Sequence, residues 1–306
     1  MIRRNLLIHS FVAVAMTVMA AAGTTTTHPT LSAEEIVKKN VAARGGLQAW
    51  RAIQTLSMSG KMQAGGNNRP VLPVPGTAGG AKVAPPRPTA QAELPFVLDL
   101  KRPLKMRVEL QFAGKTALQV YDGTNGWKLR PFLNRNDVEP YTAEEAKAAL
   151  TQSELDGELV DYQAKGTKIE LAGMEKIEDK DTYNLKLTLK NGQEKHVWVD
   201  ADTFLEARVE GTPRRLDGTI HPVYVYYRDY RQVHDVKVPF TLETKVQFSK
   251  PVAGSTQISE KITIDSVEVN PKLDESLFTK PQLNAAPSAS QAHASIQQAP
   301  TTTRLQ

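Results

Sequence analysis

Apolar and polar residues alternate with a period of two along most of the chain. Met106, Val108 and Leu110, for example, alternate with charged or amide residues, and the pattern recurs through residues 94–129 and 168–269. Such alternation is typical of strands with one buried and one exposed face. It predicts about eleven strands, joined mostly by turns of hairpin length.

Two motifs mark the beginnings of helices. Ser32-Ala33-Glu34-Glu35 and Thr142-Ala143-Glu144-Glu145 are capping boxes, in which a hydroxyl residue and a glutamate three positions later cap each other's backbone amides. The first helix is expected to end at Gly45-Gly46, with a short second one over residues 47–53. The third is expected to extend through residues 155–160. Helices on one side of an antiparallel sheet indicate the α+β class.

The same pattern divides the chain into one domain and several other segments. Residues 31–281 carry the strands and helices and are predicted to fold as a single domain. Residues 63–92 are rich in proline and glycine, which do not sustain a strand ladder, so they are interpreted as a long insertion between two strands. Residues 23–30 form a Thr-rich tether. Residues 282–306 bury too little apolar surface to fold and predict a disordered tail.

The first 22 residues have the features of a cleaved secretory signal peptide. Arg3 and Arg4 precede an apolar stretch, and Ala20-Ala21-Ala22 supplies the small residues that signal peptidase needs. The stretch is shorter than the roughly 20 residues that cross a bilayer. Because the chain has no cysteine, it offers no thiol for lipid attachment. We expect a periplasmic protein that is secreted across the inner membrane and is not lipidated.

The composition excludes several classes of protein. The chain of 306 residues contains no cysteine, so disulfides, cysteine nucleophiles and thiolate metal sites are excluded. The net charge of +5, from 38 Lys and Arg against 33 Asp and Glu, is too small for a nucleic-acid-binding surface. We therefore expect no nucleic-acid partner.

Candidate catalytic or metal-binding clusters are few. His196 and Asp200 share a face of a predicted strand and could meet a metal together with Asp202, but a strand edge followed by an aspartate-rich turn fits these residues better. The tyrosine-rich stretch 224–230 fits half-exposed strand aromatics better than a base-stacking platform. The motifs of nucleotide-binding loops, zinc hydrolases and serine hydrolases are absent from the sequence. We expect no cofactor, no metal and no catalytic residue, and hence a binding protein rather than an enzyme.

One apolar face repeats over many predicted strands and must be covered. A few short helices are a small cover for such a sheet, so we expect an apolar cavity between sheet and helices, in which methionines would suit a pliable ligand. A fully packed core fits the same pattern. The residues expected to line the cavity are Met58, Met62, Phe96, Leu98, Met106, Val108, Leu110, Leu185, Leu187, Val197, Val199, Phe240, Leu242, Ile262 and Ile264.

Five stretches, in this order, carry a family resemblance. They are residues 33–53, residues 101–109, Tyr121-Asp122-Gly123-Thr124-Asn125-Gly126-Trp127, Val199-Asp200-Ala201-Asp202-Thr203-Phe204-Leu205, and Val269-Asn270-Pro271-Lys272-Leu273-Asp274-Glu275-Ser276-Leu277-Phe278. A chain that carries these stretches in this order after a signal peptide resembles the LolA-like superfamily of periplasmic lipoprotein carriers. Members of this superfamily are often named outer-membrane lipoprotein-sorting proteins. The resemblance covers residues 33–281.

The resemblance implies a fold and a function. The implied fold is an unclosed antiparallel half-barrel around a few short helices, with a cavity that takes acyl chains. The implied function is that of a monomeric carrier that moves lipid or lipoprotein between envelope membranes, serves outer-membrane biogenesis, and meets inner- and outer-membrane envelope proteins. The alternative is an envelope regulatory or scaffold protein that uses the same half-barrel to bind a protein partner or to sense lipid, with the insertion as its docking arm.

Overall fold

The computed structural model describes His28 and residues 30–65, 91–131, 135–216, 218–248 and 259–282. The predicted signal peptide, nearly all of the tether, the centre of the insertion (66–90) and the tail (283–306) lie outside these residues. The folded domain begins at Leu31. None of its described helices is both long and apolar enough to cross a membrane.

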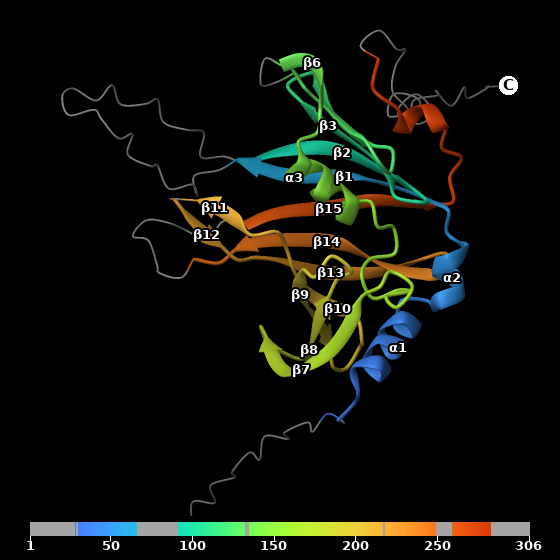
Figure 1. The fold of residues 1–306 in the computed structure, drawn as a ribbon, viewed down its shortest axis with the longest axis vertical. Coiled ribbons are helices and arrows are strands. Elements are labelled where there is room, and N and C mark those ends of the chain that lie inside the picture. Colours follow the sequence, from blue (N-terminus) through green and yellow to red (C-terminus); the bar gives the residue numbers. More distant parts are fainter. Residues whose placement is uncertain are drawn as a thin grey trace, which may run out of the picture. The chain divides into compact units, whose positions relative to one another are not determined.

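Within the described residues, thirteen antiparallel strands form one open sheet, whose arrangement can be followed in Figure 1. Their order is β6-β5-β4-β3-β2-β1-β15-β14-β13-β10-β9-β8-β7, so β6 and β7 are its two free edges, and β11 and β12 form a separate hairpin. The predicted unclosed antiparallel sheet is therefore confirmed. The strands are β1 (Thr55–Gly65), β2 (Gln91–Lys101), β3 (Lys105–Phe112), β4 (Lys115–Tyr121), β5 (Gly126–Arg130), β6 (Arg135–Pro140), β7 (Lys168–Ile177), β8 (Lys180–Thr188), β9 (Glu194–Asp200), β10 (Glu206–Glu210), β11 (Arg214–Leu216), β12 (Thr219–His221), β13 (Val223–Val233), β14 (Val236–Val246) and β15 (Ser259–Val269).

Three short α-helices of the described chain cover part of one face of this sheet, and a 3-10 helix lies against the opposite face, where Arg107 of β3 donates to the backbone oxygen of Leu277. Both predicted capping boxes are confirmed, because Ser32 with Glu35 and Thr142 with Glu145 each cap one another's backbone amides. The helices are α1 (Ala33–Ala43), α2 (Leu47–Ala52), α3 (Ala143–Gln152) and the 3-10 helix η2 (Glu275–Phe278).

The core of the described residues contains two large apolar clusters under different helices, and a third small one formed by Val223 and Val246. Trp50 of α2 and Ala149 of α3 pack against side chains from β1, β2, β3, β14 and β15 in the first cluster. Ile36 and Val37 of α1 pack against β8, β9 and β10 in the second. Burial of these side chains holds the helices on the sheet, because helices this short have little stability of their own in water.

The described residues contain fifteen strands, more than the predicted number of about eleven, and β6, β11 and β12 are strands that the pattern misses. These three strands contain few apolar residues; β6 has the sequence Arg135-Asn136-Asp137-Val138-Glu139-Pro140. They are strands because their backbones pair with a neighbour, β6 with β5 and β11 with β12. Pairing of this kind leaves no period-two apolar signal in the sequence.

The predicted insertion is narrower than residues 63–92. Gln63, Ala64 and Gly65 pair with Glu93, Ala92 and Gln91, so both strands extend into it. Backbone hydrogen bonds continue there although the side chains no longer alternate.

The third helix is shorter than predicted. It ends at Gln152, with Ser153 as its C-cap, and residues 154–166 form successive turns. Gly157 lies in this segment with a φ of +75°, which is not helical. Leu159 and Val160 are buried, as their apolar character predicts, but they project from turns rather than from a helix.

Gly45, between α1 and α2, is expected to tolerate no side chain. Its φ is +114°, and a Cβ atom would lie 2.1 Å from the carbonyl oxygen of Asp235, in the turn between β13 and β14. Gly46 has a φ of +92°, but a Cβ there would meet no atom within 4 Å. We expect Gly46→Ala to cost about 1–3 kcal/mol through backbone strain alone, and Gly45→Ala clearly more. Urea unfolding of both variants tests this; equal losses would mean that the contact with Asp235 is unimportant.

Candidate ligand-binding site

A row of paired residues crosses the sheet and changes from apolar to polar. Directly paired residues in antiparallel strands project from the same face. The row runs from β15 to β6 through Val267, Met58, Leu98, Val108, Gln119, Lys128 and Glu139. Along this row, the face of the sheet is apolar on β15, β1, β2 and β3 and polar on β4, β5 and β6.

The structure distributes the fifteen predicted cavity residues over the two clusters. Eleven belong to the first, and Leu185, Leu187, Val197 and Val199 belong to the second, where all four are buried under α1. In the first cluster, Phe96, Met106, Phe240 and Ile264 are buried. The other seven are only half-buried and are Met58, Met62, Leu98, Val108, Leu110, Leu242 and Ile262. That these residues line a ligand cavity stays a prediction.

Strand pairing joins six of these seven half-buried residues, which together we call the apolar face. Leu242 pairs with Ile262 and Ile262 with Met62, while Leu98 pairs with both Met58 and Val108. Six of the seven are thus direct neighbours in two rows across five strands. All seven pack against the first cluster, and the surface they form is partly accessible and built from aliphatic and thioether side chains.

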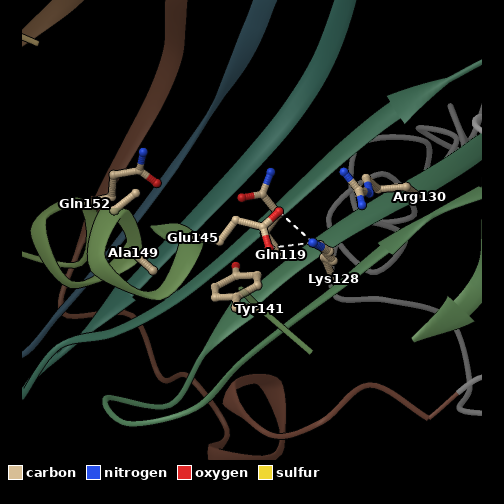
Figure 2. A pocket seen from close by; sticks show the side chains of 8 residues that line it. Gln119, Lys128, Arg130, Tyr141, Glu145, Ala149 and Gln152 are labelled. Atoms are coloured by element: carbon tan, nitrogen blue, oxygen red, sulfur yellow. Dashed lines mark hydrogen bonds and ion pairs between the residues drawn. The ribbon is translucent and has the colours of Figure 1, made fainter. Parts of the chain in front are cut away.

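A small cavity lies at the polar end of the long row, beneath α3. It has a volume of about 120 Å³ and is lined by Gln119, Lys128, Arg130, Tyr141, Glu145, Ala148, Ala149 and Gln152. Figure 2 shows that the hydroxyl group of Tyr141 points towards the side on which Gln119 and Glu145 lie. Ala149 and Tyr141 also pack on the first apolar cluster, so this polar pocket borders the apolar surface.

A buried lysine and a glutamate connect the sheet to α3 in this pocket. Lys128 is only 7% exposed, and its Nζ contacts both carboxylate oxygens of Glu145, at 2.6 Å from Oε1. Oε2 of Glu145 also accepts a hydrogen bond from the backbone N–H of Thr142. Burial opposes ionisation of Glu145, but the bonds from Lys128 and Thr142 outweigh it and lower its pKa. Glu145 is therefore charged at neutral pH and holds the N-terminus of α3 on β5.

Two donors in the pocket have no partner among the described residues. The Nε atom of Arg130 and the hydroxyl group of Tyr141 are both buried and make no hydrogen bond there. A second nitrogen of Arg130 contacts Glu139 at 3.1 Å. Burial, and then the charge of Glu145, raise the pKa of Tyr141, so its hydroxyl keeps its proton and remains a donor. Unpaired buried donors cost stability, and such groups are often found where a ligand supplies the missing acceptor.

The alternation of apolar and polar residues did not reveal this pocket, because in β5 a polar side chain is more buried than its apolar neighbours. In Gly126-Trp127-Lys128-Leu129-Arg130 the apolar side chains suggest the buried face, yet Lys128 is buried and Trp127 only half-buried. Trp127 pairs with Val120, on the face opposite to Gln119 and Lys128. Only the register of β4 and β5 shows that these polar residues continue the apolar row.

The residues considered for a metal site have structural partners instead. Asp200 caps the turn that follows β9, because it accepts hydrogen bonds from the backbone amides of Asp202 and Thr203, and it pairs with Lys180 at 2.8 Å. His196 lies 2.7 Å from the side-chain oxygen of Asn184. Within the described parts of the chain, no three His, Asp or Glu side chains are placed to hold a metal ion.

Comparison with known proteins finds similarity among solved structures only. No protein-family model and no curated protein sequence matches the chain. Three crystal structures that match are a LolA superfamily protein from Nitrosomonas europaea, a putative outer-membrane lipoprotein-sorting protein domain from Vibrio parahaemolyticus and a DUF1329 family protein from Desulfovibrio piger. Their identities are 13%, 14% and 14%, with TM-scores of 0.49, 0.48 and 0.49. The matches cover 82%, 80% and 81% of this chain and 99%, 95% and 97% of those chains. The superfamily that the sequence resembles is thus represented among the matching solved structures.

Proposed function

We propose that the protein is a periplasmic carrier that binds the acyl chain of a lipid or lipoprotein against the apolar face and moves it between envelope membranes. The observation that carries the proposal is the chemistry and exposure of this face, whose seven residues are aliphatic or thioether side chains, pack against the first cluster and are all half-buried. No catalytic step is part of the proposed function.

The energetics suit reversible carriage. Burial of a CH₂ group contributes about 0.8 kcal/mol, so a chain of 16 carbons gains on the order of 10 kcal/mol when it leaves water. That is enough to keep a lipid bound in water. Because no covalent bond joins the lipid to the protein, a partner protein can take the lipid over.

The cover over the sheet is slight at the β5 end of the row, next to the apolar face. Helix α3 buries only Ala149, and Leu150 on the same helix is 45% exposed. A chain can therefore reach the apolar face at this end with little disruption of packed core.

Native mass spectrometry with lipid extraction tests the proposal. The full chain is purified from a periplasm without detergent, and we expect about one acyl lipid per chain. A clean apoprotein mass, together with no uptake of a fluorescent fatty acyl probe, would contradict the proposal. The apolar face would then be packed core, and the regulatory or scaffold alternative would take precedence.

A further inference from the structure

We propose that the pocket beneath α3 binds an anionic head group, a carboxylate or a phosphate, of the amphiphile whose chain lies on the apolar face. This inference rests on the proposed function and deepens it, because it names the chemical class of the ligand. The observation behind it is the row of paired residues that passes from Met58, Leu98 and Val108 directly to Gln119 and Lys128.

The dimensions fit a single-chain amphiphile. Neighbouring strands in a sheet lie about 4.8 Å apart, and β1 and β5 are four strand spacings apart in the sheet order. That distance, on the order of 19 Å, is close to the length of an extended acyl chain of about 16 carbons. The cavity at the end of the row, about 120 Å³, holds a head group of the size of a carboxylate or phosphate.

The charges favour an anion over a cation. The charged residues that line the pocket are Lys128 and Arg130, with two positive charges, and Glu145, with one negative charge, which leaves one positive charge in excess. Glu145 is already neutralised by Lys128, and Glu139 is shared between Arg130 and Arg135 at 3.1 and 3.6 Å. An incoming anion would therefore meet a positively charged and partly enclosed site, where charge interactions are stronger than in water.

The unpartnered groups in the pocket are donors. The Nε atom of Arg130 and the hydroxyl group of Tyr141 are buried without an acceptor among the described residues. A carboxylate or phosphate oxygen supplies acceptors and no obligatory donor, so it satisfies both. The orphaned donors indicate a ligand with acceptor oxygens and do not indicate an amine.

Binding of matched amphiphiles to the delipidated full-length protein tests the inference. The probes are dodecanoate, dodecyl phosphate and dodecanol, which share one chain, together with acetate and inorganic phosphate, which have none. We expect at least one of the two anionic amphiphiles to bind about tenfold or more tightly than dodecanol, because a hydrogen bond to a charged group contributes about that factor. The tighter of the two anions then identifies the kind of head group.

Arg130→Met and its matched control, Arg135→Met, test whether the preference for an anionic head group arises in the pocket. Arg130→Met is expected to reduce the affinity for the anionic amphiphile to within about twofold of that for dodecanol, while the affinity for dodecanol stays unchanged. Arg135→Met removes the same charge and a contact to the same Glu139 from an exposed position outside the pocket, and we expect wild-type binding.

Tyr141→Phe gives a readout that a purely structural role would not produce. Removal of an unpartnered buried hydroxyl should leave the unliganded protein equally stable or raise its Tm. The same change should weaken binding of the anionic amphiphile about threefold to tenfold. A fall in Tm with unchanged binding would contradict the inference.

The outcomes separate this inference from the proposed function. If dodecanol binds as tightly as the anions, the head-group site is wrong and chain binding stands. If acetate or phosphate alone binds as tightly as the amphiphiles, the pocket takes free anions and the inference is overturned. If no probe with a chain binds, the proposed function itself fails, and the inference fails with it.

Discussion

Leu98→Arg is expected to weaken binding of an acyl probe by at least about tenfold while the domain remains folded. Leu98 is half-buried and lies between Met58 and Val108 in the row that crosses the sheet. An arginine there can turn its charged end to water, so the fold tolerates it. Its charge nevertheless lies against the path of the chain, and desolvation of a guanidinium by an acyl chain costs more than the contact returns.

Val97→Arg is the matched control. Val97 is the preceding residue of β2, is also half-buried, and pairs with Ser59 and Glu109 on the opposite face of the sheet. We expect it to bind the probe as the wild type does. Fluorescence titration measures the affinity, and circular dichroism establishes that both variants are folded. Equal losses of affinity in the two variants would show that the chain does not lie on the apolar face.

Leu187→Arg cannot serve in place of Leu98→Arg, although both leucines belong to the predicted cavity set. Leu187 is fully buried in the second cluster beneath α1, so a charge there would unfold this part of the domain and the result would say nothing about binding. In the sequence the two positions look alike, because each is an apolar residue in an alternating strand. Only the helices packed above them distinguish a buried leucine from an accessible one.

Features that depend on residues close together in the sequence could be predicted, whereas features that depend on contacts between distant parts of the chain could not. The alternation in β3 and the capping boxes of α1 and α3 are local, so the strand and both helix starts were predictable. The pairing of β1 with β15 joins Met58 to Val267, far apart in the chain, and no local pattern specifies it. The polar pocket depends on the packing of α3 over β5, where Glu145 contacts Lys128, and the alternation within β5 does not show that a helix buries Lys128.

Arg44→Met is expected to lower the free energy of unfolding by about 3–5 kcal/mol, a large part of the 5–15 kcal/mol typical of a domain. Arg44 follows α1 and donates from Nη1 to a carboxylate oxygen of Glu206 at 3.1 Å and to the backbone oxygen of Asp156 at 3.0 Å. The side chains of Arg44 and Glu206 are only 9% and 6% exposed. Removal of the guanidinium leaves a buried carboxylate without its cation, which is the costly way to break such a pair.

Tyr230 cannot replace the lost cation. Its hydroxyl donates to the other carboxylate oxygen of Glu206 at 3.1 Å, and burial, followed by the charge of Glu206, raises its pKa well above the usual value. It therefore stays neutral and supplies one hydrogen bond but no charge. Arg44 also stacks over the ring of Trp50 at 4.3 Å, so the same change removes packing between α2 and the end of α1.

Arg51→Met is the matched control for this prediction. Arg51 also pairs with a carboxylate, that of Asp161 at 2.5 Å, but its side chain is 51% exposed, so water compensates the loss and we expect a much smaller effect. In the double variant Arg44→Met with Glu206→Gln, the uncompensated charge is gone, and part of the lost stability should return. Urea unfolding measures all three variants. If Arg44→Met lost no more stability than Arg51→Met, burial of the Arg44–Glu206 pair would not be what holds the end of α1 against β10.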